Sequence, residues 1–424
     1  MGMSENLTAE ILCVGTELLL GDIVNTNAAF LSQRLADLGI SVYHHSVVGD
    51  NPERLAQTLG LSLSRADIVI TSGGLGPTKD DLTKETVAKA LGLPMELDER
   101  SLEYIRAYFK ARGKEMTENN KKQAMMPRGA VVFRNRYGTA PALAVKEGEK
   151  TVIMLPGPPN ELIPIFNEEV APYLRERSSS VIVSKNVHLI GIGESALAEL
   201  IDDILVSATN PTIAPYCSSG EVRLRVSAKS ESYEDAVRLC DEGVARILQS
   251  KACEFVYGVD VGNTERALVQ ELKARGLTLS VAESCTGGLM AKRITDISGC
   301  SDVFLGGCVT YTNEMKQTLL GVSGATLAAH TAVSAEVAME MARGVRERTG
   351  SDVALSATGI AGPGGDGTGI PVGTVYIGMS THDGDSYIKL ELSPNKSREY
   401  IRQVSATNAY HAALKYLSQK APRT

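Results

Sequence analysis

A serine in a glycine-ended turn is the residue of this 424-residue chain whose position first suggests chemistry. Ser284 lies within 277–288, which reads Leu-Thr-Leu-Ser-Val-Ala-Glu-Ser-Cys-Thr-Gly-Gly, and Leu289–Ile297 follows with helical spacing of apolar residues. In open α/β sheets, reactive groups gather beyond the carboxyl ends of the strands, so Ser284 is a candidate nucleophile. For an isolated motif of this kind, capping of the helix by Ser284 or Thr286 is the simpler interpretation.

A serine hydroxyl needs a nearby base to attack at neutral pH, and no histidine is close to Ser284 in the sequence. A lysine can replace histidine when burial lowers its pKa. Lys316 is a candidate, because Tyr311 is expected to end a strand and Lys316 to lie on the helix that follows. On spacing alone, a solvent-exposed helix lysine is the simpler interpretation.

Two further features of this part of the chain suit an anionic ligand. A glycine-rich loop from Gly359 to Gly369 follows the expected strand Asp352–Thr358 and would cradle an anion or a sugar. Arg398 and Arg402 are one turn apart on the expected last helix and would clamp a phosphate. An ordinary exposed basic helix face is the alternative interpretation of this pair.

A glycine loop near the N-terminus follows the expected strand Ala66–Thr71 and reads Ser-Gly-Gly-Leu-Gly-Pro-Thr-Lys-Asp-Asp. The glycines permit close approach of the backbone to a ligand, and the next helix would point free N–H groups into the same space. Asp80 and Asp81 can hold a hard cation through oxygen contacts. Capping of the helix by Asp80, Asp81 and Thr83 is the competing interpretation, and the two are compatible.

Strands and helices alternate at the start of the chain, which predicts a parallel sheet with right-handed crossovers. A β-α-β-β-α piece follows from about residue 178, with a helix expected over Glu194–Val206, and a second α/β unit begins near Asn263. The first expected elements are the strands Ala9–Gly15, Ile40–Val48 and Ala66–Thr71 and the helices Asn25–Leu38 and Pro52–Ser64.

Composition narrows the class of protein. Hydrophobic residues make up 43% of the chain with only 5% aromatic, which suits α/β layers built from aliphatic side chains. The net charge of -7 argues against a nucleic-acid coat. Seven scattered cysteines without a C-x-x-C pair suit free thiols in a reducing cytoplasm. No apolar run is long enough to span a membrane, and residues 1–6 lack the pattern of a signal peptide.

Four ordered motifs in the last third of the chain closely resemble those of the CinA C-terminal family, the nicotinamide-nucleotide amidohydrolases. That family converts nicotinamide mononucleotide to nicotinate mononucleotide and ammonia. The resemblance implies Ser284 as nucleophile, Lys316 as base and Tyr311 as an orienting or relay group, with no cofactor. The four motifs are Ala282–Gly288, Val309–Lys316, Gly359–Pro363 and Pro371–Val375.

The same resemblance implies which residues bind the substrate. Backbone N–H groups from Cys285 to Gly287 would stabilise the oxyanion. In the family an arginine near the last helix contacts the substrate phosphate, and Arg398 matches its position best, with Arg402 second. The full substrate-binding set is Cys285, Thr286, Gly287, Gly288, Thr358, Gly359, Gly362, Arg398 and Arg402.

The N-terminal half resembles the molybdopterin-binding-like domain of full-length CinA proteins, through Val14–Gly21, Gly73–Asp81 and Leu155–Pro159. In the family this domain is associated with metal-dependent ADP-ribose pyrophosphatase activity. Asn135–Ala142 departs from the family's usual Asn-Pro-x-Gly-Thr-Ala-Pro-Gly. The implied nucleotide site is Gly15, Thr16, Glu17, Gly73, Gly74, Gly76, Thr78, Asn135 and Thr139, with Asp80 and Asp81 near a divalent metal ion.

The resemblance covers nearly the whole chain and implies three α/β or α+β domains. They are a three-layer molybdopterin-binding-like α/β domain over 1–175, a small α+β KH-like domain over 176–258 and an α/β amidohydrolase domain over 259–424. A cytoplasmic homodimer is expected, with nicotinamide mononucleotide and ADP-ribose as ligands and without membrane or direct nucleic-acid binding. The rival hypotheses are a non-enzymatic adaptor in competence or the DNA-damage response, and a pterin-binding module.

Overall fold

The computed structural model describes residues 7–176, 181–218 and 220–420. Its contacts divide the chain into two compact units, Met1–Ser184 with Ala228–Arg238 and Lys185–Ser227 with Leu239–Thr424. The predicted division into 1–175, 176–258 and 259–424 therefore stays a prediction. Among the described residues, no helix is both long enough and apolar enough to cross a membrane. The expectation about a signal peptide in residues 1–6 lies outside the described part.

The N-terminal sheet has six strands in the order β2-β1-β3-β8-β7-β6. The neighbours from β2 to β8 are parallel, as the alternation of strands and helices predicted, whereas β7 and β6 add on antiparallel. A separate pair joins β4 (Met95–Leu97) to β5 (Met125–Pro127). The strands of the main sheet are β1 (Thr8–Val14), β2 (Ser41–Val48), β3 (Ile68–Ser72), β6 (Val131–Phe133), β7 (Ala142–Glu147) and β8 (Lys150–Leu155).

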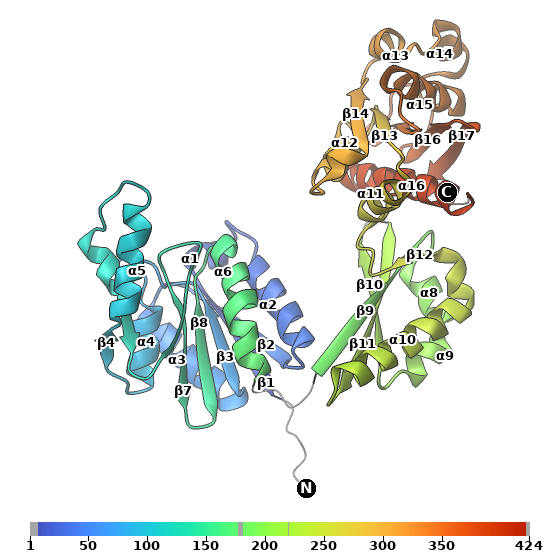
Figure 1. Ribbon diagram of the computed structural model, residues 1–424. Helices are drawn as coiled ribbons and strands as arrows, with labels where there is room; N and C mark the ends of the chain where they lie inside the picture. The colour runs from blue at the N-terminus through green and yellow to red at the C-terminus, as the bar shows by residue number, and fades with distance from the viewer. Residues whose placement is uncertain (1–6, 177–180, 219, 421–424) are drawn as a thin grey trace. The chain divides into compact units, whose positions relative to one another are not determined.

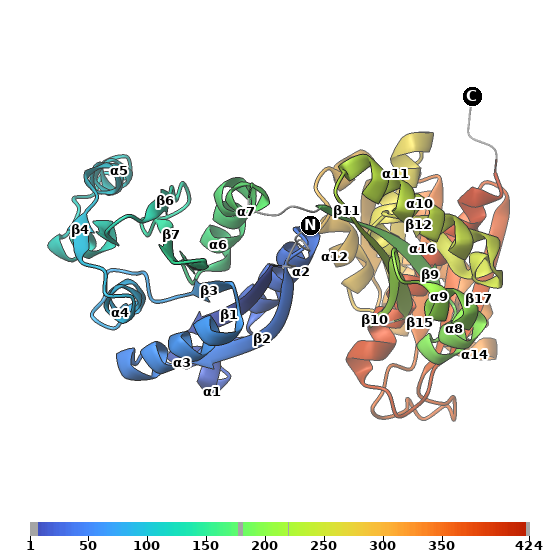
Figure 2. The same ribbon diagram turned by 90° about the horizontal axis from the view of Figure 1, so that it is seen from below.

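Helices cover both faces of this sheet, because alternate residues of its strands point to opposite sides. Ile11 of β1 packs in the same core as Leu31 of α2, whereas its neighbour Leu12 packs in the core that contains Leu55 of α3. Figure 2 shows the strands between α6 and α3. The predicted three-layer α/β architecture is thus confirmed. The helices are α1 (Thr16–Leu20), α2 (Thr26–Asp37), α3 (Pro52–Arg65), α4 (Thr83–Ala90), α5 (Glu99–Lys110), η1 (Glu118–Ala124), α6 (Pro159–Ile165), η2 (Phe166–Val170) and α7 (Ala171–Arg175).

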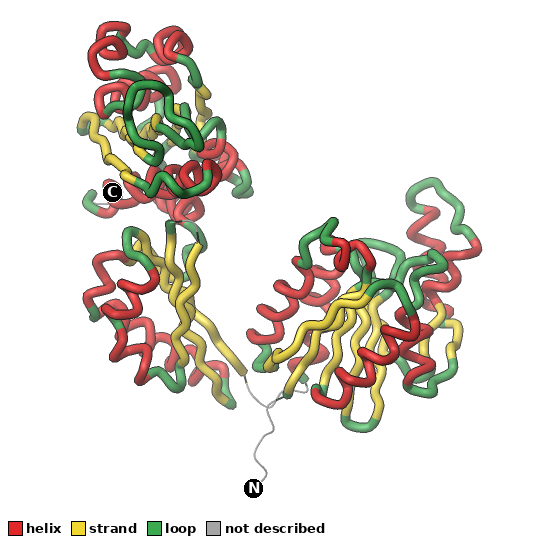
Figure 3. Tube along the Cα trace, turned by 180° about the vertical axis from the view of Figure 1, so that it is seen from behind, coloured by secondary structure: helices red, strands yellow, loops and turns green. Residues whose placement is uncertain are grey.

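Loops gather at the carboxyl ends of the parallel strands of this unit (Figure 3). Asn25 and Asn51 accept backbone hydrogen bonds at the starts of α2 and α3. Helix α3 begins soon after β2, whereas α1 lies between β1 and α2. The glycine loop after β3 reaches the same edge. The fold therefore brings together, at one end of the sheet, loops that are far apart in the sequence.

A four-stranded sheet in the order β10-β11-β9-β12 forms the middle of the chain. One helix was expected over Glu194–Val206, but the structure has two, separated at Ile201. That residue is fully buried in the local core and leaves helical geometry, with φ -122° and ψ 26°. The elements are β9 (Val181–Ile190), α8 (Glu194–Leu200), α9 (Asp202–Ser207), β10 (Thr212–Ser218), β11 (Glu221–Ser230), α10 (Tyr233–Gln249), η3 (Lys251–Phe255) and β12 (Val256–Val259).

The C-terminal sheet has the order β14-β13-β15-β16-β17, with β13 parallel to both of its neighbours. Tyr311 was expected to end a strand, but β14 stops at Val309, so Tyr311 lies in the connection to α13. The strands are β13 (Leu279–Glu283), β14 (Phe304–Val309), β15 (Val353–Gly359), β16 (Thr374–Thr381) and β17 (Gly384–Glu391). The helices are α11 (Thr264–Arg275), α12 (Leu289–Thr295), η4 (Cys300–Asp302), α13 (Asn313–Leu320), α14 (Gly324–His330), α15 (Ala335–Thr349) and α16 (Arg398–Ser418).

The strand β13 is buried on both faces, which fixes the residue that follows it. Val281 packs in a core with Leu268 of α11 and Tyr410 of α16, and Ala282 packs on the other face with Val337 of α15. Figure 1 shows α13, α14 and α15 above this sheet and α11 and α16 below it. The carboxyl end of β13 is therefore held inside the sheet, between β14 and β15, and the candidate nucleophile follows it directly.

Candidate active site

Ser284 and Lys316 meet at the carboxyl end of β13. The Nζ atom of Lys316 lies 3.0 Å from Ser284 Oγ and 3.0 Å from the carbonyl oxygen of Thr310. Lys316 is only 1% exposed and Ser284 is 9% exposed. The interpretation of Lys316 as a solvent-exposed helix lysine is therefore wrong, because its side chain points inward beside the serine.

Burial also changes the acid–base chemistry of Lys316. Loss of hydration disfavours the ammonium and lowers the pKa of Lys316 from its ordinary value of 10.5, and the electrostatic influence of Cys285 partly opposes this. A neutral amine at this place can donate to Thr310 O while its lone pair accepts the Ser284 hydroxyl proton. The pair has the arrangement of a nucleophile and its general base.

Cys285, the neighbour of the serine, is not a competing nucleophile. Its side chain is buried, and burial raises the pKa of the Cys285 thiol to about 12. The thiolate is the nucleophilic form of cysteine, and this thiol stays protonated near neutral pH. The Ser284 hydroxyl therefore remains the candidate reactive group of the turn.

Backbone hydrogen bonds fix both members of the pair to the central strands. Ser284 N–H donates to Ala357 O of β15 at 2.9 Å, and Thr310 N–H donates to Glu283 O of β13 at 2.8 Å. Thr312 then caps α13 by accepting from Met315 N–H at 3.2 Å, which starts the helix that carries Lys316. The distance between hydroxyl and amine is thus set by the sheet.

The helix after the nucleophile turn is capped by neither Ser284 nor Thr286, so the capping interpretation of these residues is wrong. The carboxylate of Glu283, which is fully buried, takes that role instead. Residue Gly288 occupies the N-cap position and has no side chain to offer. The donors to Glu283 are Gly288 N at 2.9 Å, Met290 N at 3.0 Å and Ala291 N at 2.8 Å.

The N–H groups available for an oxyanion are fewer than the sequence suggested. Gly287 N–H donates to Ser284 O at 3.1 Å and is already engaged. Within the described chain, no acceptor engages the backbone N–H groups of Cys285 and Thr286. These two remain as candidate oxyanion donors next to the nucleophile.

The two arginines of α16 have different partners. Arg398 donates from Nη1 to Gly362 O and from Nη2 to the Tyr311 hydroxyl, each at 2.8 Å. Arg402 instead donates from Nη2, at 2.5 Å, and from Nε, at 3.2 Å, to Thr286 O. Arg398 is exposed, as is Tyr311, so this pair can meet an anion, whereas Arg402 is committed to the nucleophile turn.

Two other predicted substrate residues have contacts within the protein. The Thr358 hydroxyl donates to Ala332 O at 2.7 Å. A Cβ atom at Gly359 would lie 2.6 Å from Thr374 O, so this glycine permits close pairing of β15 with β16. Two buried hydroxyls in the same part, those of Thr286 and Thr310, have no partner among the described residues.

A second candidate site lies in the N-terminal unit, in a pocket of about 460 Å³ at the carboxyl edge of the six-stranded sheet. Its walls come from the loops after β1, β2, β3 and β8 and from the loop before β7. Asp50, Gln123 and Glu161 also line it and were not predicted. The predicted residues that line it are Gly15, Glu17, Gly73, Gly74, Gly76, Thr78, Asp80, Asp81 and Thr139.

This N-terminal pocket is strongly acidic. Its described lining includes five carboxylates and neither lysine nor arginine. Asp81 accepts from Thr78 N–H at 2.8 Å, and Asp50 accepts from Thr16 N–H at 3.0 Å. Among the described residues, no side chain or N–H group contacts the carboxylates of Glu17 and Asp80 in this way. The five acidic residues are Glu17, Asp50, Asp80, Asp81 and Glu161.

The proposed capping of α4 by Asp80, Asp81 or Thr83 is wrong. The N-cap residue is Leu82, which makes no side-chain cap, and the Thr83 hydroxyl donates to Gly73 O at 2.9 Å. Asp81 closes the tight turn that begins at Thr78. Asp80 is thereby left facing the pocket.

Of the predicted nucleotide site, Thr16 and Asn135 are outside this pocket lining. Thr16 holds Asp50, as described above. Asn135 is fully buried, accepts from Gly138 N–H at 2.8 Å and donates to Glu161 at 2.6 Å. Asn135 thus organises its loop and orients a carboxylate of the pocket.

The residues that sequence reasoning missed differ in how easily they could have been found. Asp50 follows β2 and Glu161 follows β8, so the rule that ligands bind beyond strand ends would have identified them. Glu283 is the last residue of a buried strand. Its role depends on the turn bringing α12 back onto its carboxylate, for which the local sequence holds no signal.

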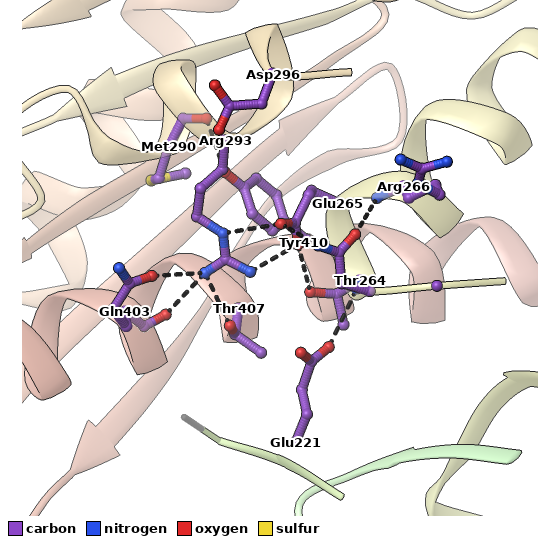
Figure 4. A network of polar contacts seen from close by, with 12 residues as sticks. Glu221, Thr264, Glu265, Arg266, Met290, Arg293, Asp296, Gln403, Thr407 and Tyr410 are labelled. Carbon is purple, nitrogen blue, oxygen red and sulfur yellow. Dashed lines mark hydrogen bonds and ion pairs between the residues drawn. The ribbon is translucent and has the colours of Figure 1, made fainter. Parts of the chain in front are cut away.

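A buried polar network holds α12 against α11 and α16 (Figure 4). Arg293 of α12 donates to the Glu265 carboxylate at 3.1 and 2.6 Å and to the Thr407 hydroxyl at 3.0 Å. The Tyr410 hydroxyl donates to Met290 O at 2.7 Å. The helix that follows the nucleophile turn is therefore anchored at several points along its length.

Three domain families match the chain in order. They are "Probable molybdopterin binding domain" over residues 10–176, "Damage-inducible protein CinA KH domain" over 184–258 and "CinA C-terminal domain" over 262–417.

Relatives match over nearly the full length. A competence-damage inducible protein of Clostridium botulinum (strain ATCC 19397 / Type A) is 47% identical over 95% of this chain and 98% of its own. A CinA-like protein of Dictyoglomus turgidum is 48% identical over 92% of this chain and 95% of its own. The crystal structure of competence/damage inducible protein CihA from Agrobacterium tumefaciens is 38% identical, covers 37% of this chain and 94% of its own, and has a TM-score of 0.35. The chain therefore belongs to the CinA family, with molybdopterin-binding-like, KH-like and CinA C-terminal domains in that order.

Proposed function

We propose that the C-terminal site hydrolyses the carboxamide of nicotinamide mononucleotide to nicotinate mononucleotide and ammonia. The observation that carries this proposal is the buried amine of Lys316, whose pKa is lowered by burial, 3.0 Å from the hydroxyl of Ser284. Such a pair performs acyl transfer without a metal or a cofactor. The resemblance of the surrounding motifs to the amidohydrolases supports the choice of a nicotinamide nucleotide.

In the proposed reaction, Ser284 and Lys316 act in two stages, formation of an ester and its hydrolysis. Ser284 Oγ attacks the carboxamide carbon while neutral Lys316 takes its proton, and the carbonyl oxygen becomes an oxyanion between the Cys285 and Thr286 N–H groups. The C–N bond then breaks as Lys316 returns the proton to the departing ammonia, which leaves an ester on Ser284. Water, deprotonated by Lys316, cleaves that ester to release the carboxylic acid and restore the hydroxyl.

The charges around this site support an anionic substrate. Arg398 is exposed, donates to the Tyr311 hydroxyl and to Gly362 O, and has further N–H groups for a ligand. Arginine binds phosphate with paired N–H groups. We assign the substrate phosphate to Arg398, with Tyr311 orienting it or relaying a proton.

The test is product analysis by mass spectrometry with nicotinamide mononucleotide and the purified chain. Nicotinate mononucleotide and ammonia are expected in equal amounts, and an ester on Ser284 is expected after rapid quenching. Ser284→Ala is the blank variant. Formation of nicotinate mononucleotide at the same rate by Ser284→Ala would refute the mechanism.

A second activity, at the N-terminal pocket, is the hydrolysis of ADP-ribose with a divalent metal ion. The acidity of the pocket favours this proposal, because five carboxylates would repel a diphosphate unless a cation lies between them. Among the described residues, no set of three side-chain ligands is arranged to hold a metal ion. One or two carboxylates plus substrate phosphates is the usual way in which proteins hold Mg²⁺, and the free carboxylates of Glu17 and Asp80 fit that role.

This chain's own groups would hold the diphosphate on its other side. The backbone N–H groups of Gly74, Leu75 and Gly76 meet no acceptor within the described chain and line the same pocket. A bound divalent ion would neutralise phosphate charge and polarise the P–O bond. Loss of ADP-ribose turnover on chelation is expected. A larger thermal shift with a pterin than with ADP-ribose would favour the pterin-binding alternative.

The adaptor alternative finds less support in the middle of the chain. Nucleic-acid-binding KH domains clamp the backbone of four nucleotides with a GXXG loop. The junction between α8 and α9 carries Asp202 and Asp203 beside Ile201, which would repel phosphates. We propose a structural role for the KH-like segment. A cytoplasmic location and a homodimer, both expected from the sequence, are further parts of the proposal.

A further inference from the structure

We propose that Glu283 and Arg402 are positioning residues that hold the nucleophile turn from opposite sides and so shape the oxyanion site. Glu283 binds the N–H groups that follow the turn, and Arg402 binds a carbonyl within it. The inference rests on the proposed amidohydrolase function of Ser284. It adds two residues that touch neither the nucleophile hydroxyl nor the base.

The side chain of Glu283 is fully buried. An ionised carboxylate that is 0% exposed is stable only when it is paired or fully hydrogen-bonded. Glu283 satisfies this with three N–H groups at the start of α12, at 2.8 to 3.0 Å. These are the groups with which a helix N-terminus would otherwise attract an anion. The substrate phosphate is thereby excluded from this helix end and directed to Arg398.

Arg402 holds the other side of the turn. Two nitrogens of its guanidinium converge on Thr286 O, which also accepts from Leu289 N–H at 3.2 Å. Three donors on one carbonyl oxygen fix the plane of the peptide between Thr286 and Gly287. This peptide plane adjoins Thr286, whose own N–H is one of the two candidate oxyanion donors.

The engaged groups leave two donors next to the nucleophile. Ser284 N–H is used by β15 and Gly287 N–H closes the turn onto Ser284 O. The N–H groups of Cys285 and Thr286 remain. A backbone N–H directly after the nucleophile is the recurring donor of oxyanion holes built on strand–turn–helix units. In this proposal, Glu283 and Arg402 hold in place the turn that carries these two N–H groups.

The substitution Glu283→Gln tests the main claim. A carboxamide of the same size puts an NH₂ group against the N–H groups of α12, so the turn loses its fixed geometry. We expect kcat for nicotinamide mononucleotide to fall about 10- to 100-fold, because a misplaced oxyanion donor acts only in the transition state. KM is expected to change less than about threefold, since the phosphate contact is elsewhere.

A substrate analogue separates positioning from a general loss of structure. In thionicotinamide mononucleotide, sulfur replaces the oxygen that becomes the oxyanion, and sulfur is a weaker hydrogen-bond acceptor. The ratio of rates for amide and thioamide therefore measures the oxyanion site. We expect this ratio to fall toward one in Glu283→Gln and, to a smaller extent, in Arg402→Met. An unchanged ratio together with a reduced kcat would overturn the proposal.

Tyr410→Phe is the matched control. It removes a buried hydrogen bond to Met290 O on α12 but leaves the turn contacts of Glu283 and Arg402 in place. Its thermal midpoint is expected to fall while the amide-to-thioamide ratio stays at the wild-type value. If Glu283→Gln does not fold, Arg402→Met gives the same comparison, because Arg402 is only partly buried.

A reagent that needs no nucleotide distinguishes failure of this inference from failure of the proposed function. A fluorophosphonate labels activated serines through an oxyanion-like intermediate, and Ser284→Ala is the blank. Wild-type labelling without amide hydrolysis would refute the substrate assignment alone. Labelling of Glu283→Gln at the wild-type rate would refute the positioning role, and absence of wild-type labelling would refute both.

Discussion

The two candidate sites, for each of which we propose an anionic nucleotide as ligand, are surrounded by side chains of opposite charge. In the C-terminal site, the amine of Lys316 contacts the Ser284 hydroxyl, and two arginines lie nearby, Arg398 on the Tyr311 hydroxyl and Arg402 on the nucleophile turn. The N-terminal pocket gathers five carboxylates beside glycine N–H groups. Both sites lie at the carboxyl end of a parallel strand. They therefore share their place in the fold but not their chemistry. In our proposal the first site works with protein groups alone, whereas the second uses a cation to accept phosphate.

The sites also differ in how their reactive groups are held. Ser284 is held by a backbone hydrogen bond to β15 and contacts Lys316 of α13, and its turn is held by Arg402 of α16. In the N-terminal pocket, the carboxylates of Asp50 and Asp81 accept hydrogen bonds from threonines. Those of Glu17 and Asp80 accept none from the residues that the structure describes. A preorganised site suits direct attack by a side chain, and movable carboxylates suit a metal ion that completes its coordination with substrate.

The largest expected effect is a loss of amidase activity without a loss of ADP-ribose hydrolysis. In Lys316→Met, kcat/KM for nicotinamide mononucleotide should fall about 10³-fold or more, because nucleophile and base act as a unit. Lys316→Arg should fail as well, since a guanidinium stays protonated. ADP-ribose hydrolysis by the same preparations, followed by chromatography, should be unchanged. A parallel fall in both activities would break the comparison.

The next largest expected effect is a difference between substitutions of the adjacent residues Asp80 and Asp81. Asp80→Asn should reduce metal-dependent turnover of ADP-ribose about 100-fold and raise the metal concentration for half-maximal rate, since its carboxylate is free. Asp81→Asn should mainly lower the thermal midpoint, because Asp81 holds the turn at Thr78. ADP-ribose turnover measured while each variant is titrated with Mg²⁺ or Mn²⁺ gives the maximal rate and the metal concentration for half-maximal rate. A thermal melt of each variant gives the midpoint. Equal loss of activity in the two variants would contradict the division of roles.

Arg398→Ala should raise KM for nicotinamide mononucleotide about 10- to 100-fold, the range expected for a lost hydrogen bond to a charged group. Nicotinamide riboside, which lacks the phosphate, provides the control: its slow hydrolysis should be unaffected by the substitution. Steady-state kinetics with both substrates checks the prediction. A similar rise in KM for the riboside would assign Arg398 to another part of the ligand.

The smallest effect is a difference in pH dependence between the sites. The base must be neutral, so amidase kcat/KM should rise with pH through the pKa of free-enzyme Lys316 and level off above it. Burial lowers that pKa, so the midpoint should lie below the ordinary lysine value of 10.5. Rates measured in buffers of constant ionic strength, with Ser284→Ala as background, give the midpoint. A midpoint at or above 10.5 would exclude Lys316 as the base.

Local sequence patterns predicted much of the fold but missed features that depend on contacts between residues far apart in the chain. The parallel strands and their helices follow from apolar periodicity and turn residues, and they appear within one or two residues of the expected bounds. The antiparallel strand β6 has only three residues, and its pairing with β7 shows only in three dimensions. The break at Ile201 likewise depends on what that side chain buries.

Of the candidate sites, the sequence by itself determined the residue types and their place after strands: Ser284, the glycine loops and the paired aspartates. Only the tertiary structure decided which of them act together. Lys316 is 32 residues from Ser284, and its amine reaches the hydroxyl because β14 lies beside β13. Burial, which lowers the pKa of that amine, is a property of the packed core and not of its neighbours in sequence. For the same reason Glu283, an unremarked strand residue, and Arg402, an expected phosphate ligand, acquired their contacts with the turn only when α12 and α16 packed around it.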